Sequence, residues 1–411
     1  MKRSTSLLTL AFVFAAFSFG LVLCSQAQTV TYLAHFNGTN GFVPSGSVVQ
    51  AADGNFYGTT EIGGVNAEGN VFRMAPSGRI TSIYSFCSKA NCADGQRPTA
   101  GLVLGKDGNL YGVTSEGGGS LNSGIIYRMT LGGKITILYT FCHQTLCNDG
   151  NGPTGISLGS DGSFYGTTSG GGGFSSGVLF KVSSTGKFTL LHTFCSRANC
   201  ADGDIPVFPP HQGTDADFYG TTNGGGGAAL QGGVVYKLTL AGAYSVVKSF
   251  CQPSATCNTG FYPTTVVQDA TGNLFGTAQN NGSFNSGTVF EITSANKFKV
   301  LHRFNFDGGQ APTTGLTLAV DGNFYGVGVN NADFANAGSG TISNATPEGA
   351  GFGTIFKVTP EGVFSTVHTF QDGPSGPLFQ AADGNLYGVT AGDGSTDFGS
   401  VYRLSVGGSN R

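Results

Sequence analysis

Five aspartates, each followed by glycine, recur along this chain shortly before a proline. They are Asp94, Asp149, Asp202, Asp307 and Asp372. Like charges gathered around a narrow opening hold a cation or the cationic end of a ligand, so these residues are candidate ligand contacts. Asp-Gly pairs also form tight turns, and no second acidic residue accompanies each member of the series. A purely structural role therefore stays open.

Cysteines are the second candidate group. Cys24 lies in an apolar leader, and the remaining eight form close pairs in four successive stretches of the chain: Cys87/Cys92, Cys142/Cys147, Cys195/Cys200 and Cys251/Cys257. This even number at a repeated spacing predicts four local disulfides, each stabilising by about 2 kcal/mol because the closed ring is short. Zinc would need four converging ligands, and these pairs lie far apart without completing histidines, so we expect no metal.

Histidines complete the list of candidate catalytic groups. His35, His192, His302 and His368 lie one or two residues before the phenylalanine of the fourth-strand signal, which is typical of a solvated strand surface. A metal-dependent lyase would need histidines and a carboxylate that converge. No Ser/His/Asp or paired-carboxylate arrangement stands out, and glycine runs such as 117–119 lack the Lys-Ser/Thr of a phosphate loop. We expect no cofactor.

The elements that position these residues belong to an internal repeat. Asp107-Gly108-Asn109-Leu110-Tyr111-Gly112 has near-copies that start at residues 53, 161, 215, 271, 321 and 383, in steps of 54, 54, 54, 56, 50 and 62. Asp and Asn supply oxygens that calcium accepts, but one carboxylate and one amide are too few for a site, and Asp-Gly suits a short hairpin. We expect the motif to shape a turn.

Each repeat contains four strand signals. In the unit from Pro98 to Phe141 they cover residues 102–104, 109–114, 124–129 and 134–141, separated by turn formers. Seven such units predict an all-β fold, a seven-bladed β-propeller of four-stranded antiparallel blades. Residues 31–36 match a fourth strand and residues 400–405 a third strand, so we expect the N-terminal strand to complete the last blade and close the ring.

The motif Asp-Gly-Asn-Leu/Phe-Tyr-Gly, followed by Gly-Gly and by Gly-x-Val-Phe/Tyr-Lys/Arg, resembles the GloVer tandem repeat of exported bacterial choice-of-anchor proteins. The resemblance covers essentially the whole chain after the leader. It implies a secreted or surface repeat protein without an assigned activity, often with a C-terminal anchor. The chain ends at Arg411 without an apolar anchor, which favours free secretion. The unit is more distantly similar to NHL-type propeller repeats.

Composition and the N-terminal residues predict where the protein is located and which partners it lacks. Lys2 and Arg3 precede an apolar run from Leu7 to Leu23, and Ser25-Gln26-Ala27 is typical of a signal-peptide cleavage site. We expect a signal peptide at 1–27 and one propeller domain at 28–411. Charged residues make up 10% of the chain and the net charge is −3, so there is no basic footprint for nucleic acid. No later apolar run is long enough to span a bilayer, and we expect a monomer.

Loops of a four-stranded meander alternate between the two faces of the ring. Turns after the first and third strands are tight, whereas loops after the second and fourth are long and carry the cysteines, the five aspartates and an insertion between Val329 and Gly353. Function sits on loops held by a rigid scaffold. We expect the aspartates to ring the mouth of the central channel and the long-loop face to bind a glycan or a protein. The alternative is an extracellular lyase or glycan-active hydrolase at the channel mouth.

Overall fold

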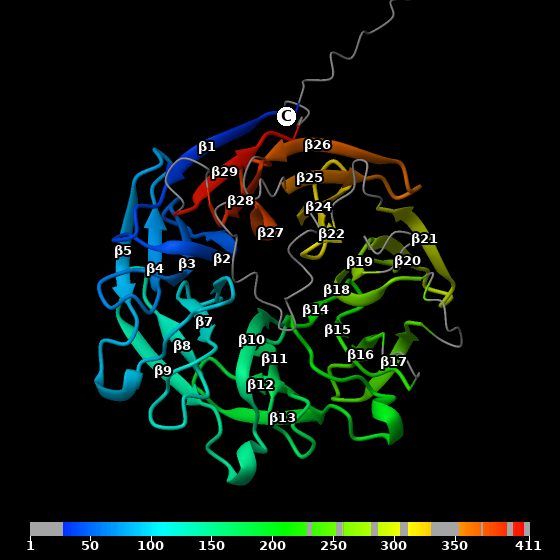
Figure 1. Cartoon of the computed structure of the whole chain (residues 1–411), viewed down its shortest axis with the longest axis horizontal. Coiled ribbons are helices and arrows are strands. Elements are labelled where there is room, and N and C mark those ends of the chain that lie inside the picture. The colour runs from blue at the N-terminus through cyan, green and yellow to red at the C-terminus, as the bar shows by residue number, and fades with distance from the viewer. Residues whose placement is uncertain are drawn as a thin grey trace, which may run out of the picture.

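The chain forms a ring of β-sheets around a central axis in the computed structural model (Figure 1). The structure describes residues 28–227, 232–251, 257, 259–280, 287–304, 311–329, 353–370, 373–392 and 398–406. Within these ranges seven antiparallel sheets are present, each the blade of a propeller. The predicted fold class, an all-β seven-bladed propeller, is confirmed.

Six blades follow one another along the chain, each from the inner to the outer strand. The first two comprise β2 (Phe42–Gln50), β3 (Phe56–Ile62), β4 (Asn70–Met74) and β5 (Ile80–Ser85), then β6 (Val103–Leu104), β7 (Leu110–Thr114), β8 (Ile125–Met129) and β9 (Ile135–Thr140). The next two comprise β10 (Asn151–Leu158), β11 (Phe164–Gly170), β12 (Val178–Val182) and β13 (Phe188–Thr193), then β14 (His211–Gln212), β15 (Phe218–Thr222), β16 (Val234–Leu238) and β17 (Tyr244–Ser249). The fifth and sixth comprise β18 (Phe261–Gln268), β19 (Leu274–Asn280), β20 (Thr288–Ile292) and β21 (Phe298–Arg303), then β22 (Ala311–Pro312), β23 (Thr317–Leu318), β24 (Phe324–Val329), β25 (Gly353–Val358) and β26 (Phe364–Phe370).

The seventh blade is built from both ends of the chain. Its strands are β27 (Pro374–Gln380), β28 (Leu386–Thr390), β29 (Ser400–Leu404) and, on the outside, β1 (Val30–His35). β1 pairs antiparallel with β29, so that Val30 lies opposite Leu404 and His35 opposite Ser400. The predicted closure of the ring by the N-terminal strand is therefore confirmed, and the last blade has no missing outer strand.

The Tyr-Gly pair of the second strand fixes how each blade packs. The glycine lies directly opposite the aromatic residue of the third strand, as Gly58 lies opposite Phe72. A Cβ added to Gly58 would sit 2.5 Å from the Phe72 ring, and the same short approach recurs at the equivalent glycines. Glycine is needed here because the far end of the aromatic ring closely approaches the backbone of the neighbouring strand.

Aromatic contacts join each blade to the next. The phenylalanine at or just after the end of the fourth strand of one blade packs against the third-strand aromatic of the next, with ring centroids 4.9 to 5.6 Å apart, at all seven boundaries. Phe36, which follows β1, makes this contact with Phe72 of the first blade and so closes the series. The core is thus a ring of aromatic residues in the edge-to-face and tilted arrangements that such rings prefer.

Candidate functional site

The long loops of each blade meet on one face of the ring, as the repeat predicts. The N–H groups of Gly118, Gly172 and Gly226 donate to the carbonyl oxygens of Cys92, Cys147 and Cys200, at 2.8 to 2.9 Å. These glycines belong to the loop after the second strand, and the cysteines belong to the loop after the fourth strand of the preceding blade. The glycine runs therefore join neighbouring loops, and we call the surface they form the long-loop face.

All four predicted disulfides are present. They join Cys87 to Cys92, Cys142 to Cys147, Cys195 to Cys200 and Cys251 to Cys257. The first three enclose short 3₁₀ turns, η1 (Ala90–Cys92), η2 (Thr145–Cys147) and η3 (Ala198–Cys200), which project from the outer part of the ring (Figure 1). The bridges therefore clamp the loops that carry the aspartate series.

Asp94, Asp149 and Asp202 are buried beneath these disulfide loops. The Asp94 carboxylate accepts hydrogen bonds from the Tyr84 hydroxyl at 2.6 Å, from the Ser88 N–H and hydroxyl at 3.0 and 2.7 Å, and from the Lys89 N–H at 3.0 Å. These bonds outweigh the effect of burial and hold the pKa of Asp94 below its usual 3.8.

The other two aspartates repeat this arrangement. Asp149 accepts from the Tyr139 hydroxyl at 2.7 Å and from two backbone N–H groups. Asp202 lies 3.0 Å from the His192 ring nitrogen and also accepts from Ser196 and Arg197. Because Tyr84, Tyr139 and His192 stand on outer strands, these carboxylates lie at the rim and not at the channel mouth. That part of the prediction is wrong, and their role as ligand contacts stays a prediction.

Two members of the series, Asp307 and Asp372, lie outside the described residues, as do residues 330–352 of the predicted insertion.

The histidines of the fourth strands belong to the rim. His192 stacks on Tyr244 at 3.8 Å and His302 on Phe364 at 3.7 Å, each ring reaching the first residue of the next blade's outer strand. These histidines join blades at the outside of the ring instead of facing the channel.

Inner strands approach one another closely around the axis. A Cβ added to Gly46 would lie 2.0 Å from the backbone nitrogen of Gly101, and one added to Gly376 would lie 2.6 Å from the backbone of Gly46. Side-chain hydroxyls also bond across these boundaries, as the Ser375 hydroxyl does to the Pro44 carbonyl at 3.0 Å. At this level three neighbouring inner strands are in backbone contact, which narrows the centre of the ring.

The chain enters several inner strands through strained residues. Val43, Arg97, Ile205 and Tyr262 each precede a proline and have φ between 52° and 59°. This left-handed conformation is uncommon outside glycine, above all for β-branched residues, and such strain clusters at functional sites. Ile205 and Tyr262 are exposed despite being large and apolar. Sequence reasoning missed this set, for which a residue other than glycine before the repeated proline would have been the signal.

Exposed apolar side chains extend further over the long-loop face. Val65, Leu121 and Phe174 stand in the loop after the second strand of the first three blades, and Leu146 stands in a disulfide loop. One cluster of charged residues on this face is internally paired, whereas Lys89 and Arg197 of the disulfide loops are exposed. Arg97 forms ion pairs with Glu61 and with Glu116, the latter at 3.7 Å between Nε and Oε1.

The opposite, tight-turn face carries the Asp-Gly-Asn hairpins. In six blades the aspartate accepts a hydrogen bond from the tyrosine four residues later, as Asp53 does from Tyr57 at 2.7 Å. Burial and this bond to Asp53 raise the pKa of Tyr57 to about 12. Where Lys181 lies opposite Tyr165, its ammonium contacts Asp161 at 2.7 Å. The motif therefore shapes the turn, as predicted, and also anchors a buried tyrosine.

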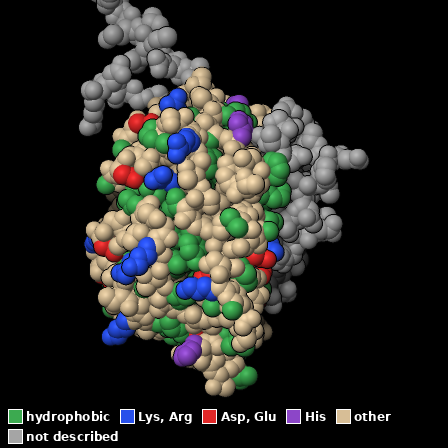
Figure 2. All heavy atoms as spheres, turned by 90° about the vertical axis from the view of Figure 1, so that its left-hand side faces the viewer, with side chains coloured by type: hydrophobic (Ala, Val, Ile, Leu, Met, Phe, Trp, Pro, Cys, Tyr) green, Lys and Arg blue, Asp and Glu red, His purple; other side chains and the backbone are tan. Residues whose placement is uncertain are grey.

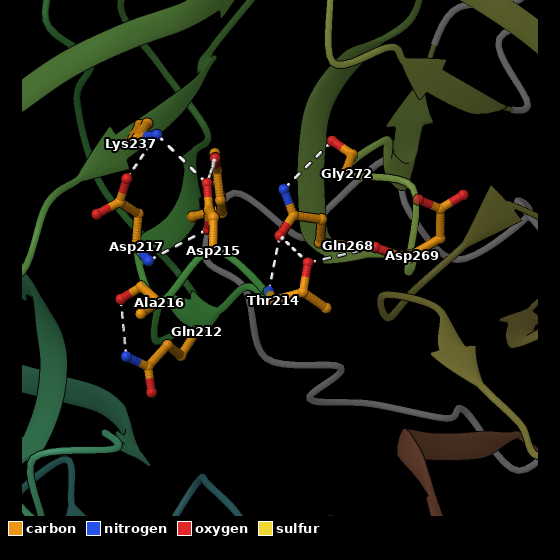
Figure 3. A network of polar contacts seen from close by, with 10 residues as sticks. Gln212, Thr214, Asp215, Ala216, Asp217, Lys237, Gln268, Asp269 and Gly272 are labelled. Carbon is orange, nitrogen blue, oxygen red and sulfur yellow. Dashed lines mark hydrogen bonds and ion pairs between the residues drawn. The ribbon is translucent and has the colours of Figure 1, made fainter.

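Glutamines bridge neighbouring blades on the tight-turn face (Figure 3). The Gln268 carbonyl oxygen accepts from the Thr214 N–H of the preceding blade at 2.7 Å, while its NH₂ donates to Gly272 in its own turn. Gln50, Gln212 and Gln380 make the same bridge. A glutamine three residues before the start of the repeated hairpin motif was the sequence signal for this bridge, and it was not used in the prediction.

Charge is sparse on the surface. Figure 2 looks at the rim from the side of β5 and β9, where Lys, Arg, Asp and Glu are scattered among uncharged side chains. Within the described ranges, no group of three or more His, Cys, Asp or Glu residues is placed to hold a metal ion. No helix in the described part of the chain is long and apolar enough to cross a membrane.

Solved structures of the same fold belong to proteins of different activities. A polysaccharide lyase, the PL25 ulvan lyase bound to a GlcA-Rha3S saccharide, matches with a TM-score of 0.56 and 11% identity over 92% of this chain and 95% of its own. The extracellular domain of a B. thetaiotaomicron protein classed as a one component system matches with a TM-score of 0.54 and 11% identity over 92% of this chain. The match spans only 40% of that second chain. At this identity the likeness shows the fold alone.

No curated protein sequence matches the chain. The Gloeobacter/Verrucomicrobia repeat, by contrast, matches residues 19–208, 158–352 and 210–411, which together cover nearly all of it. The matched stretches contain the Asp-Gly hairpins, the Tyr-Gly pairs and the third-strand aromatics that build each blade. The chain therefore belongs to the Gloeobacter/Verrucomicrobia repeat family.

Proposed function

We propose that this protein is exported, acts as a monomer and binds a neutral glycan through its long-loop face. The observation that carries the proposal is the set of exposed apolar side chains on loops that disulfides and backbone hydrogen bonds hold in place. Function resides on loops that a rigid scaffold positions, and here the scaffold is the propeller.

The chemistry of the face suits a saccharide. Aromatic rings such as Phe174 and Tyr262 pack against the C–H faces of sugars, and the surrounding serine, asparagine and backbone groups hydrogen-bond hydroxyls. A largely uncharged loop surface favours a neutral ligand over an anionic polymer. Rigid loops also lose little conformational entropy on binding.

Export is supported by two features. The predicted signal peptide at residues 1–27 directs secretion, and four disulfides persist in oxidising compartments. Mass spectrometry of the mature protein from the growth medium or periplasm tests this part. We expect the chain to begin at Gln28 and to carry no free thiols, and a cytosolic chain with an intact N-terminus would contradict it.

Binding is tested with the mature chain on an array of neutral glycans. Phe174→Ser and Tyr262→Ser remove exposed rings from the long-loop face, and each is expected to weaken binding by about tenfold. Val320→Ser and Val363→Ser are matched controls, because both valines are exposed on the tight-turn face. Loss of glycan binding in the control variants alone would show that the binding site lies on the tight-turn face instead. If no glycan on the array binds and a defined protein partner is captured instead, the ligand of the long-loop face is a protein and not a glycan.

A further inference from the structure

Three blade boundaries are sealed at the tight-turn face by a glycine hairpin. The hairpin between the third and fourth strands lies against the outer strand of the preceding blade. A Cβ added to Gly78, Gly133 or Gly186 would lie 2.2, 2.3 or 2.7 Å from a carbonyl oxygen of that strand, at Leu33, Ile83 and Leu138 respectively. The two backbones are therefore in direct contact at these three boundaries.

The boundary between the third and fourth blades is open at this place. Gly242 is the equivalent glycine, with φ +86°, yet a Cβ added to it would meet no atom within 4 Å. Leu191 of β13, the counterpart of Leu138, instead lines a cavity of about 330 Å³ together with the hairpin 238–242. The deeper contacts of the boundary remain, since Tyr165 and Phe218 stack at 3.9 Å. The opening is thus confined to the rim.

An apolar side chain is left uncovered at this opening. Leu240 stands at the hairpin position that Leu131 occupies in the second blade. Leu131 packs against the core cluster between the first two blades, whereas Leu240 is 45% exposed and lines the cavity. The same residue type at the same repeat position is therefore partly buried at a sealed boundary and exposed at this open one.

Charged and polar groups face the apolar wall. Lys181 and Lys187 line the cavity together with the hydroxyl-bearing Ser163 and Thr189. The Lys181 ammonium is fixed by Asp161 at 2.7 Å and lies over the Tyr165 ring, so two lysines line the cavity and one of them is paired with a carboxylate. The cavity volume falls at the small end of the range for small-molecule sites.

We propose that this cleft binds a small organic carboxylate, with the anion at Lys181 and Lys187 and an apolar body against Leu191 and Leu240. The site lies on the face opposite the proposed glycan surface and does not depend on it. Phenylacetate is a suitable probe because it joins a carboxylate to one ring. Phenylacetamide has the same shape without the charge, and glucuronate has the charge without the apolar body.

The test is isothermal titration of the mature full-length chain with these three probes. We expect phenylacetate to bind, and the other two to bind at least about tenfold more weakly. Lys187→Gln should raise the phenylacetate Kd about tenfold, and Leu240→Ser should weaken binding as well. Lys134→Gln is the matched control, since Lys134 follows Gly133 in the second blade as Lys187 follows Gly186, and the boundary beside it is sealed.

Several outcomes would overturn the proposal. No phenylacetate binding, equal binding of phenylacetamide, or equal losses in Lys187→Gln and Lys134→Gln would each do so. Tighter binding of glucuronate than of phenylacetate would overturn the role of the apolar wall. Glycan binding to the long-loop face is expected to be the same in Lys187→Gln and in the unmodified chain, so the two proposals fail separately.

Discussion

The two faces of the ring use the same Asp-Gly dipeptide in different ways. On the tight-turn face Asp107 is exposed, and its carboxylate anchors one tyrosine hydroxyl and its own turn. In the rim loops of the long-loop face Asp94 is fully buried and accepts four hydrogen bonds. The difference teaches that the dipeptide marks a turn, while the number of donors around the carboxylate decides how much stability depends on it.

The largest effect is expected from Asp94→Ala. The change leaves the Tyr84 hydroxyl, the Ser88 groups and the Lys89 N–H without their acceptor in a buried loop, which should cost about 3 kcal/mol or more of unfolding free energy. Urea unfolding followed by circular dichroism measures it. A loss below about 1 kcal/mol, combined with loss of a bound ligand, would instead support the predicted ligand role of this aspartate.

Asp107→Ala should have a smaller effect, about 1 kcal/mol, because water can solvate the exposed turn and only the bond to the buried Tyr111 is lost outright. The same unfolding measurement applies, with Asp94→Ala run beside it. Equal losses in the two variants would break the distinction between the faces.

As the pH falls, protonation of a rim histidine should lower the stability of the fold before the aspartates are protonated. Burial lowers the pKa of His302 from 6.5 to about 4, so the folded chain holds this ring neutral against Phe364. The folded pKa lies below the unfolded one; stability from this group is full above about pH 6.5 and declines as pH falls toward 4. Thermal unfolding across this range should show a falling midpoint, with a shallower fall in His302→Phe. An identical slope in the variant would contradict this assignment.

The smallest effect should come from Tyr127→Phe, and it should have the opposite sign. The Tyr127 hydroxyl is buried over Gly112 without a hydrogen-bond partner, and four other blades carry phenylalanine at this position. Removing it should leave stability unchanged or raise it by up to about 1 kcal/mol. Tyr84→Phe is the contrast, because that hydroxyl donates to Asp94 and its loss should destabilise the rim. A clear loss of stability in Tyr127→Phe would show that the hydroxyl has a partner.

Much of the blade could be predicted because its residues repeat. The strands expected at 109–114 and 124–129 are observed as β7 and β8 to within one residue, since glycine and aromatic positions fix their register. The disulfides followed from cysteines five or six residues apart. The closure by β1 followed from a lone fourth-strand pattern at the start of the chain.

Features that depend on how two blades approach could not be predicted in this way. Gly242 is a glycine at the same repeat position as Gly133 and Gly186, so the amino-acid sequence does not indicate that its hairpin stands away from the preceding blade. The rim position of Asp94 depends on its bond to Tyr84, ten residues earlier on an outer strand. A repeat pattern predicts the features that all blades share, whereas these properties depend on how the contacts of one blade with its neighbour differ from those of another.

The pairing of β1 with β29 also decides how the ring would respond to a pulling force. The strands run antiparallel, and Val30, near the start of the described chain, lies opposite Leu404, near its end. A force that separates the two ends therefore loads the ladder from one side and opens its hydrogen bonds one after another, instead of shearing them all at once. Peeling away this single strand would release Phe36 from Phe72 and expose the seventh blade while the other six remain folded. Under tension between the termini, the boundary between the first and last blades would therefore be the first part of the molecule to open.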